Sequence, residues 1–251
     1  MEDTITKIYG GKWWKTDFHV HTPASEDYGK GSENPEDEKN ITPKEFLLNA
    51  MSKKLDCLII SDHNTFKWIP QLGIALKEME ENNEIGYRKI YIFPAVELNV
   101  NGNIHVLGIF DIGTDYETLA GILGKVEYSD SCKATTKSLA EVIEIIVKNG
   151  GIAIPAHVDG PSGMFYEELC SASTIKSALE VDGILALEMT GLEVCHQLYI
   201  ENKKKLSYVL GSDSHCLESL GKNYTWVKMG TPNIEALRLA LFDEEYNGLI
   251  N

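Results

Sequence analysis

The 251-residue sequence predicts an α/β fold in a single domain, built around a parallel sheet or barrel. Apolar, β-rich runs alternate along the chain with amphipathic helical runs, which is the order typical of βαβ units. Most of the expected strands are continuous apolar runs, and such runs suit strands that are covered on both faces. Six of the seven histidines lie in polar clusters at the ends of these runs. Strand ends converge at the mouth of a barrel, so the histidines point to the same architecture.

The alternation defines each element in order along the chain. The expected strands cover residues 16–20, 57–61, 90–93, 104–110, 152–156, 183–188, 208–211 and 225–228. The expected helices cover residues 43–53, 67–82, 116–124, 139–149, 165–179, 192–204 and 234–242. Thr42 is a good N-cap for the first helix, and Pro43 suits the first helical position. Asn149-Gly150-Gly151 is a good stop signal for the fourth.

Two long connections interrupt this pattern. Residues 24–40 are polar and rich in Gly, Glu and Asp, which predicts a mobile loop. Because this loop directly follows His21, it could act as a lid over a site. Residues 123–138 form the second long connection. The sequence shows no internal repeat, low-complexity tract or linker, so one domain over residues 1–251 is the simplest organisation.

Composition narrows the class of protein. No run of 18 apolar residues suggests a transmembrane helix, and the first residues do not resemble a secretory signal. The five cysteines form no CxxC pair, so we expect reduced thiols and a cytoplasmic location. The net charge is −15, and a strongly acidic surface repels a phosphate backbone. This disfavours a large nucleic-acid footprint and leaves a small phosphorylated substrate open, because bound cations would supply local positive charge.

The polar clusters have the composition of a metal site. In Asp17-Phe-His19-Val-His21, the two histidines lie two residues apart on a strand and therefore project to the same face. The other candidates each follow or flank an apolar run: Asp62, His63, Glu97, His105, His157, Asp213 and His215. A lone histidine in a strand is more often a hydrogen-bonded core residue. So many ionisable groups would be very costly to bury without a cation, however, and imidazole with carboxylate suits Zn, Mn or Fe.

In order along the chain, the motifs read His19-Val-His21-Thr22-Pro-Ala-Ser25, Ser61-Asp62-His63-Asn64, Ala95-Val-Glu97, Ile104-His105-Val-Leu-Gly108, Ala156-His157 and Gly211-Ser-Asp213-Ser-His215. As a set, they resemble the motifs of the PHP family (polymerase and histidinol phosphatase domains). The resemblance runs from Asp17 to His215, nearly the whole chain. Each motif alone is weak, and the complete set in this order is specific.

The resemblance implies a distorted (β/α)7 barrel with two to three divalent ions, such as Mn, Zn or Fe, at its carboxyl face. The implied ligands are His19, His21, His63, Glu97, His105, His157 and Asp213, with His215 alongside. Glu97 would bridge two ions. A further acid after the first motif is either Glu26 or Asp27; Asp27 is favoured, and the alternative is that both are solvated loop acids. Asp62 is expected to support catalysis by orienting a histidine.

Paired cations fit hydrolysis of a phosphate ester by a metal-activated water. The leading expectation is a phosphatase of a small phosphomonoester such as a nucleotide, with Asp213 or His215 assisting proton transfer to the leaving group. Lys30 and Lys133, on the long loops, could meet the phosphate, although loop lysines are more often solvated. Glu188 could contact substrate or cap the rim.

Two other functions stay open at this stage. One is a phosphodiesterase or exonuclease acting on nucleic-acid ends, alone or with a separate ATPase partner. The acidity of the chain and its two arginines disfavour this activity. The other is a non-catalytic metal-binding module of a larger complex, which the near-complete ligand set disfavours.

Overall fold

The computed structural model describes residues 11–100, 103–166, 170–191, 196–202, 206–242 and 249–250. The strands are β1 Lys12–Val20, β2 Cys57–Ile60, β3 Tyr91–Val100, β4 Ile104–Ile109, β5 Tyr128–Ser129, β6 Ala134–Thr135, β7 Ile152–Pro155, β8 Ala186–Glu188, β9 Ser207–Val209, β10 Thr225–Met229 and β11 Leu249–Ile250. The helices are α1 Pro35–Lys39, α2 Pro43–Ser52, α3 Ile69–Glu81, α4 Tyr116–Lys125, α5 Leu139–Lys148, α6 Ala172–Glu180, α7 Gln197–Asn202 and α8 Ile234–Phe242.

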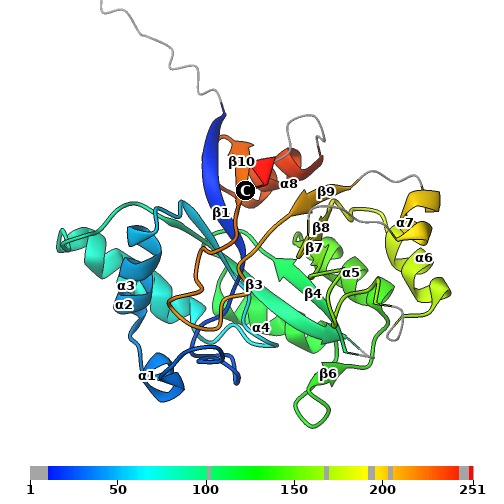
Figure 1. The fold of residues 1–251 in the computed structure, drawn as a ribbon, viewed down its shortest axis with the longest axis horizontal. Coiled ribbons are helices and arrows are strands. Elements are labelled where there is room, and N and C mark those ends of the chain that lie inside the picture. Colours follow the sequence, from blue (N-terminus) through cyan, green and yellow to red (C-terminus); the bar gives the residue numbers. More distant parts are fainter. Residues whose placement is uncertain are drawn as a thin grey trace, which may run out of the picture.

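The main sheet has the strand order β11-β10-β1-β2-β3-β4-β7, with the β5–β6 hairpin attached to β3 through β6. Strands β8 and β9 pair with each other in a separate parallel ladder. The backbone nitrogen of Val158, just after β7, donates to the carbonyl oxygen of Glu188 in β8 at 2.9 Å. Helices α2 and α3 flank one side of the strands, and α5, α6 and α7 flank the other (Figure 1). The fold is therefore mixed α/β around a central sheet, and the strand ladders of the described residues do not close into the ring that a (β/α)7 barrel requires.

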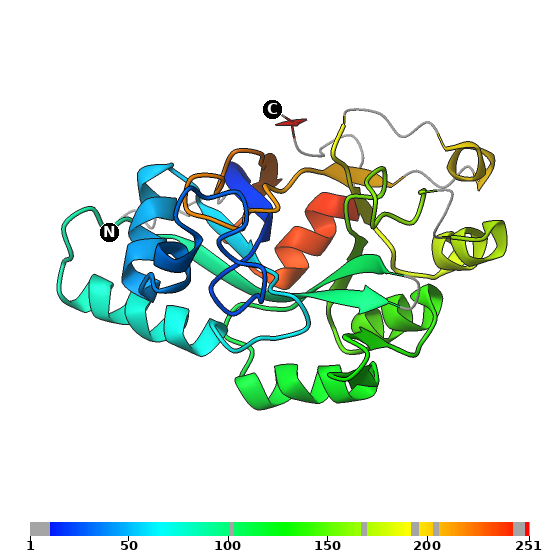
Figure 2. The ribbon, with the colours of Figure 1, turned by 60° about the horizontal axis from the view of Figure 1, so that its bottom comes forward.

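A cluster of buried apolar side chains fills the space that the strands enclose. Alternate residues of each strand point into it, as Ile59 and Phe93 do, while Leu58 and Ile60 point outward to α2 and α3. All the longer strands contribute to the inner cluster, and α8 packs on it through Ile234 and Leu237. Helix α8 (orange-red) lies against the middle of the strands in Figure 2. Burial on both faces is the reason that these strands read as continuous apolar runs.

The prediction that the strands are parallel is wrong for part of the sheet. β3 and β4 form an antiparallel pair, β4 pairs antiparallel with β7, and β1 pairs antiparallel with β10. Only three residues separate β3 from β4, and a parallel crossover needs a dozen or more. Strand β3 also extends well beyond the expected 90–93, so Glu97 lies within it rather than after it. In the sequence between the two strands, Asn-Gly is a pair typical of hairpin connections, which the expectation of parallel strands did not take into account.

The helices begin where the sequence provides caps. Thr42 and Glu45 form a complete capping box at α2, and Ser138 and Glu141 form another at α5. The expected helix over 165–179 starts later, at Ala172, because the side chain of Ser171 accepts a hydrogen bond from the backbone nitrogen of Thr174. Of the expected helix over 192–204, the described part forms α7; residues 192–195 and 203–205 lie outside the described residues.

The segment 24–40, expected as a loop, contains the short helix α1. Its mobility stays a prediction. Within the described ranges, no helix has the length and apolar character needed to cross a membrane. The four cysteines for which the structure gives a position, Cys57, Cys132, Cys170 and Cys216, are unpaired thiols.

Candidate metal centre

The two histidines of the first motif face one another at the end of β1. His19 and His21 are completely buried, and their Nε2 atoms are 3.0 Å apart. A proton can lie between two such nitrogens only if one ring donates to the other. Both Nε2 atoms also approach carboxylate oxygens, Glu97 Oε2 at 3.3 Å from each and Asp213 Oδ1 at 3.5 and 3.2 Å. The pair is thus arranged as the sequence period predicts, with both rings turned toward the same acids.

Glu97 is the centre of the cluster. One of its oxygens, Oε1, lies 2.6 Å from His105 Nδ1 and 3.1 Å from His157 Nε2. The other, Oε2, lies 3.0 Å from His63 Nδ1 as well as near His19 and His21. Five imidazoles, from β1, from β4 and from the segments after β1, β2 and β7, therefore surround one carboxylate that is 1% exposed. His105 reaches this rim from the start of β4 because β4 runs antiparallel to β3.

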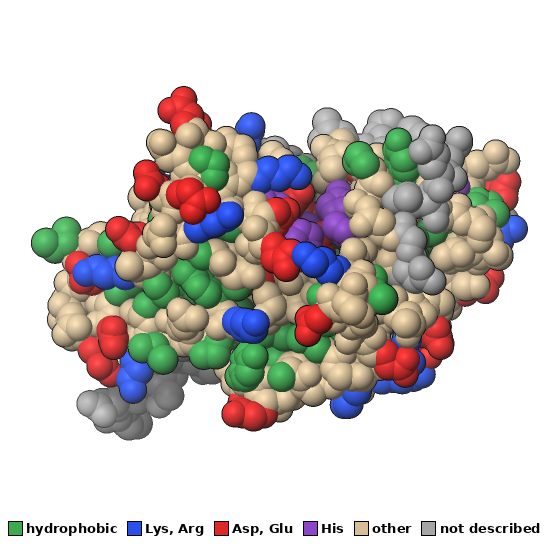
Figure 3. All heavy atoms as spheres, turned by 90° about the horizontal axis from the view of Figure 1, so that it is seen from below, with side chains coloured by type: hydrophobic (Ala, Val, Ile, Leu, Met, Phe, Trp, Pro, Cys, Tyr) green, Lys and Arg blue, Asp and Glu red, His purple; other side chains and the backbone are tan. Residues whose placement is uncertain are grey.

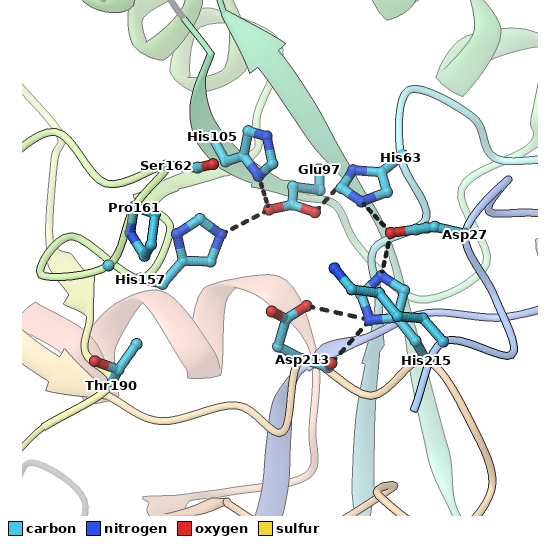
Figure 4. Close-up of a pocket in the computed structure, with 12 residues that line it drawn as sticks. Asp27, His63, Glu97, His105, His157, Pro161, Ser162, Thr190, Asp213 and His215 are labelled. Carbon is cyan, nitrogen blue, oxygen red and sulfur yellow. Dashed lines mark hydrogen bonds and ion pairs between the residues drawn. The ribbon is translucent and has the colours of Figure 1, made fainter. Parts of the chain in front are cut away.

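A second acid, Asp27, organises the other side of the cluster. Its Oδ2 atom lies 3.0 Å from His215 Nε2 and 3.7 Å from His63 Nε2 (Figure 4). The neighbouring Glu26 instead forms an ion pair with Lys133. The geometry therefore favours Asp27 over Glu26 as the additional acid near the histidines.

Buried groups behind the cluster hold the first-motif imidazoles in one orientation. His19 Nδ1 lies 2.9 and 3.1 Å from the two carboxylate oxygens of Glu188, which is itself almost fully buried. His21 Nδ1 lies 2.9 Å from Ser25 Oγ, which donates to Asp62 Oδ1 at 2.9 Å. If each Nδ1 carries the proton, each Nε2 presents a lone pair to the cluster, as a metal ligand must. Asp62 thus acts on His21 through Ser25, away from the open cavity.

His215 is oriented in the same manner by backbone. Its Nδ1 lies 3.0 Å from the carbonyl oxygen of Asp213 and can donate to it, so Nε2 is the ring nitrogen that faces Asp27. A lone pair facing a carboxylate at 3.0 Å is repulsive unless a cation or a proton lies between them.

The donor set fits divalent cations. Glu97 Oε2, Asp27 Oδ1 and His215 Nε2 are buried atoms without a hydrogen-bond partner of good geometry. Candidate ligand atoms within 4.8 Å of one another form four groups of three: His19/His21/Asp213, His19/Glu97/His157, His63/Glu97/His105 and His21/His63/His215. Imidazole with carboxylate is the donor chemistry of Zn, Mn and Fe sites.

The pKa values of Glu97 and His63 are shifted by the attraction between the imidazole rings and the carboxylates. Burial would raise the pKa of Glu97, yet the surrounding histidines hold it well below its ordinary value. Burial would lower the pKa of His63, yet Asp27 and Glu97 raise it to about 10. In the metal-free protein, the neighbouring carboxylates therefore favour the protonated form of His63, and that proton would have to leave when a cation binds.

The cluster opens into a cavity of about 320 Å³. Figure 3 shows the histidines at this hollow, with acidic and basic side chains beside them. Glu97, His63, His105, His157, Asp213 and His215 line it together with Asp27, Lys30, Ser162 and Thr190. Lys30 thus lies at the cavity wall, and its contact with a phosphate stays a prediction. Lys133 lines an adjoining hollow, and Glu188 lies behind His19 instead of at the cavity wall.

Sequence reasoning missed several contributors. The Ser25 hydroxyl connects Asp62 to His21 through two hydrogen bonds. Its position four residues after His21, within the first motif, was the only sequence feature that could have indicated this role. Ser162 and Thr190 line the cavity from loops with no chemical motif.

No protein-family model and no curated protein sequence matches the chain. Solved structures do match. The lesion-specific endonuclease Q of Pyrococcus furiosus aligns with a TM-score of 0.66 at 18% identity, over 92% of this chain and 56% of that one. A Bifidobacterium adolescentis protein assigned as a metal-dependent phosphoesterase aligns with a TM-score of 0.51 at 16% identity, over 90% and 95% of the two chains.

An amidohydrolase of Chromobacterium violaceum aligns with a TM-score of 0.52 at 17% identity, over 82% of this chain and 89% of that one. The chain therefore shares its fold with these three proteins. It spans little more than half the length of the endonuclease Q structure, and at these identities the likeness establishes the fold alone.

Proposed function

We propose that this chain is a metal-dependent phosphoesterase of the PHP type that hydrolyses a small phosphomonoester, such as a nucleotide, by a metal-activated water. The observation that carries the proposal is Glu97, a buried carboxylate surrounded by five imidazoles at the floor of an open cavity. A structural metal site would be closed, whereas a catalytic site keeps positions open to solvent and substrate.

His19, His21 and Asp213 would hold one ion, and Glu97 would bridge it to a second ion held with His105 and His157. His63, His215 and Asp27 would hold a third. Manganese, zinc or iron would fit these donors. When bound, such ions lower the pKa of a coordinated water and neutralise phosphoryl oxygens.

The chain's own groups would then position the substrate and move protons. Lys30 at the cavity wall would pair with a phosphoryl oxygen as a point charge. Asp213, whose side chain is half exposed, and His215 lie at the same wall, and whichever of the two is not engaged as a ligand would assist proton transfer to the departing alcohol oxygen. Asp62 would keep His21 in its ligand tautomer through Ser25.

One observation favours a second candidate, hydrolysis of nucleic-acid ends. A lesion-specific endonuclease is among the proteins with this fold. The net charge of −15 opposes a long nucleic-acid footprint, so we place this activity second. The separate ATPase partner and the cytoplasmic location stay predictions from the sequence.

The test begins with elemental analysis of the purified protein. Metal-replete protein is then assayed with Mn²⁺ on p-nitrophenyl phosphate, bis(p-nitrophenyl) phosphate and a labelled oligonucleotide. We expect two to three ions per chain and cleavage of the monoester; His19→Ala should lower the metal content and abolish the cleavage. His196→Ala is the control, because His196 stacks on Phe165 rather than joining the cluster. Cleavage of only the diester or oligonucleotide would select the second candidate, and metal-loaded protein inert on all three would refute both.

A further inference from the structure

A second hollow of about 280 Å³ adjoins the metal cavity. Asp27, His63 and His105 line both spaces, so they form a ridge between them. The remaining walls of the second hollow are Glu26, Asn64, Asn99, Tyr128 and Lys133. We call this space the Tyr128 hollow. A phosphate held beside the ridge would have its ester oxygen within reach of this hollow.

The outer wall is an element that the sequence did not predict. Tyr128 and Lys133 belong to the β5–β6 hairpin, which is joined to β3 where Thr135 pairs with Val100. The Lys133 side chain forms its ion pair with Glu26, next to the proposed ligand Asp27. The hairpin is therefore tied both to β3 and to the loop that follows the first motif.

The inner wall is held by amide groups. Asn64 Oδ1 accepts a hydrogen bond from the backbone nitrogen of Asn99 at 3.0 Å, and Asn99 Nδ2 donates to the carbonyl oxygen of Lys133 at 3.0 Å. The Tyr128 ring packs with part of its surface against the buried apolar cluster that contains Leu98 and Val100. Tyr128 is thus supported by the core and also forms part of the wall of the hollow, and a stacking contact with a bound ring requires both.

The two spaces differ in charge. The metal cavity would bind a phosphate, because its cations outweigh the three carboxylates of Asp27, Glu97 and Asp213. In the Tyr128 hollow beyond the ridge, the charges of Glu26 and Lys133 offset each other, and the amides are neutral. An uncharged planar group that can stack and form hydrogen bonds matches this second environment.

We propose that the Tyr128 hollow is the subsite for the organic part of the ester, and that Tyr128 selects substrates carrying an uncharged planar ring. This inference rests on the proposed phosphoesterase function, with the phosphate at the metal cluster. An aryl phosphate and a nucleoside monophosphate share the required ring, and the experiment distinguishes them.

The experiment compares wild type, Tyr128→Leu and Tyr128→Phe on three monoesters: phenyl phosphate, adenosine 5′-monophosphate and glycerol 2-phosphate. Leucine keeps apolar packing and removes the ring, while phenylalanine keeps the ring. Aromatic stacking on a base is worth about 1–3 kcal/mol, so Tyr128→Leu should lower kcat/KM for the ring-bearing esters roughly 5- to 150-fold. Glycerol 2-phosphate should change less than twofold, and Tyr128→Phe should resemble wild type. A loss with both ring esters indicates that any ring suffices, and a loss with the nucleotide alone indicates a nucleoside.

A binding measurement separates this proposal from the phosphoesterase assignment. Saturation-transfer NMR with adenosine, which has no phosphate, should show contact with wild type and a weaker signal with Tyr128→Leu. Tyr116→Ala is the matched control, since Tyr116 is a surface tyrosine at the start of α4. If adenosine binds in a Tyr128-dependent way but no ester is cleaved, the enzyme assignment fails and the subsite stands. Equal kinetics of Tyr128→Leu and wild type on all three esters, or adenosine binding unaffected by the substitution, would overturn the subsite.

Discussion

Glu188→Gln tests the idea that buried groups behind the cluster tune the metal ligands. Glu188 presents two oxygens to His19 Nδ1, at 2.9 and 3.1 Å, and its Oε2 also accepts from the backbone nitrogen of His157 at 3.1 Å. Glutamine has nearly the same shape but only one acceptor oxygen and no charge. It can therefore satisfy only one of the two donors well, and it makes the His19 ring a weaker ligand.

The expected magnitude follows from this arrangement. Changing a group that orients a ligating histidine typically weakens metal affinity about 10- to 100-fold. This corresponds to about 1.4–2.7 kcal/mol of binding free energy. We expect the effect in the upper half of that range, because two proposed ligands, His19 and His157, depend on the same carboxylate.

The assay is competition for Zn²⁺ between the protein and a chromophoric chelator at fixed pH. Glu180→Gln is the control, because it removes the same charge from an exposed position of α6. Circular dichroism before the titration establishes that both variants are folded. A Glu188→Gln dissociation constant within twofold of wild type would refute the reasoning, since the carboxylate would then have no influence on a ligand.

Three further predictions concern the ligands and their setting. Asp27→Asn should lower the metal content by about one ion per chain in elemental analysis, whereas Glu26→Gln should not; equal losses would contradict the placement of Asp27. In metal-free protein, burial would lower the pKa of His63, but neighbouring carboxylates raise it to about 10 from 6.5 in the unfolded chain. The resulting stabilisation is complete below pH 6.5 and is lost as the pH rises to about 10, so Tm should fall over this range and should fall less with metal bound. Gly211→Ala would bring a Cβ atom to 2.4 Å from the backbone nitrogen and Cβ of His19, so urea denaturation should show a loss of about 1–3 kcal/mol; unchanged stability would refute this close approach.

Much of the candidate site could be predicted from the sequence because its spacing follows the backbone period. His19 and His21 share a face since strand side chains alternate, and the structure brings their Nε2 atoms together. The other proposed ligands join the same cluster around Glu97 and Asp27. Polar side chains that directly follow buried strands lie at the edge of the sheet, where they come close to one another.

Other features could not be predicted from local patterns. The direction of β4 depends on its partners β3 and β7, and an apolar run reads the same in either direction. Each strand of the β5–β6 hairpin is only two residues long, which is too short to show the alternation of apolar and polar residues that predicts a strand. Glu26 and Asp27 are adjacent and chemically alike, so the choice between them depends on which one lies near His215.

The sequence alone determined the α/β class, most of the helices and strands, and the identity of the residues that form the cluster. These properties depend on periodicity, capping and residue chemistry, which act over a few neighbouring positions. Only the tertiary structure decided that Asp27 rather than Glu26 lies beside His215, that Glu188 lies behind His19, and that Tyr128 borders a second hollow. Each of these depends on segments far apart in the chain, whose pairing is set by the packing of the whole core.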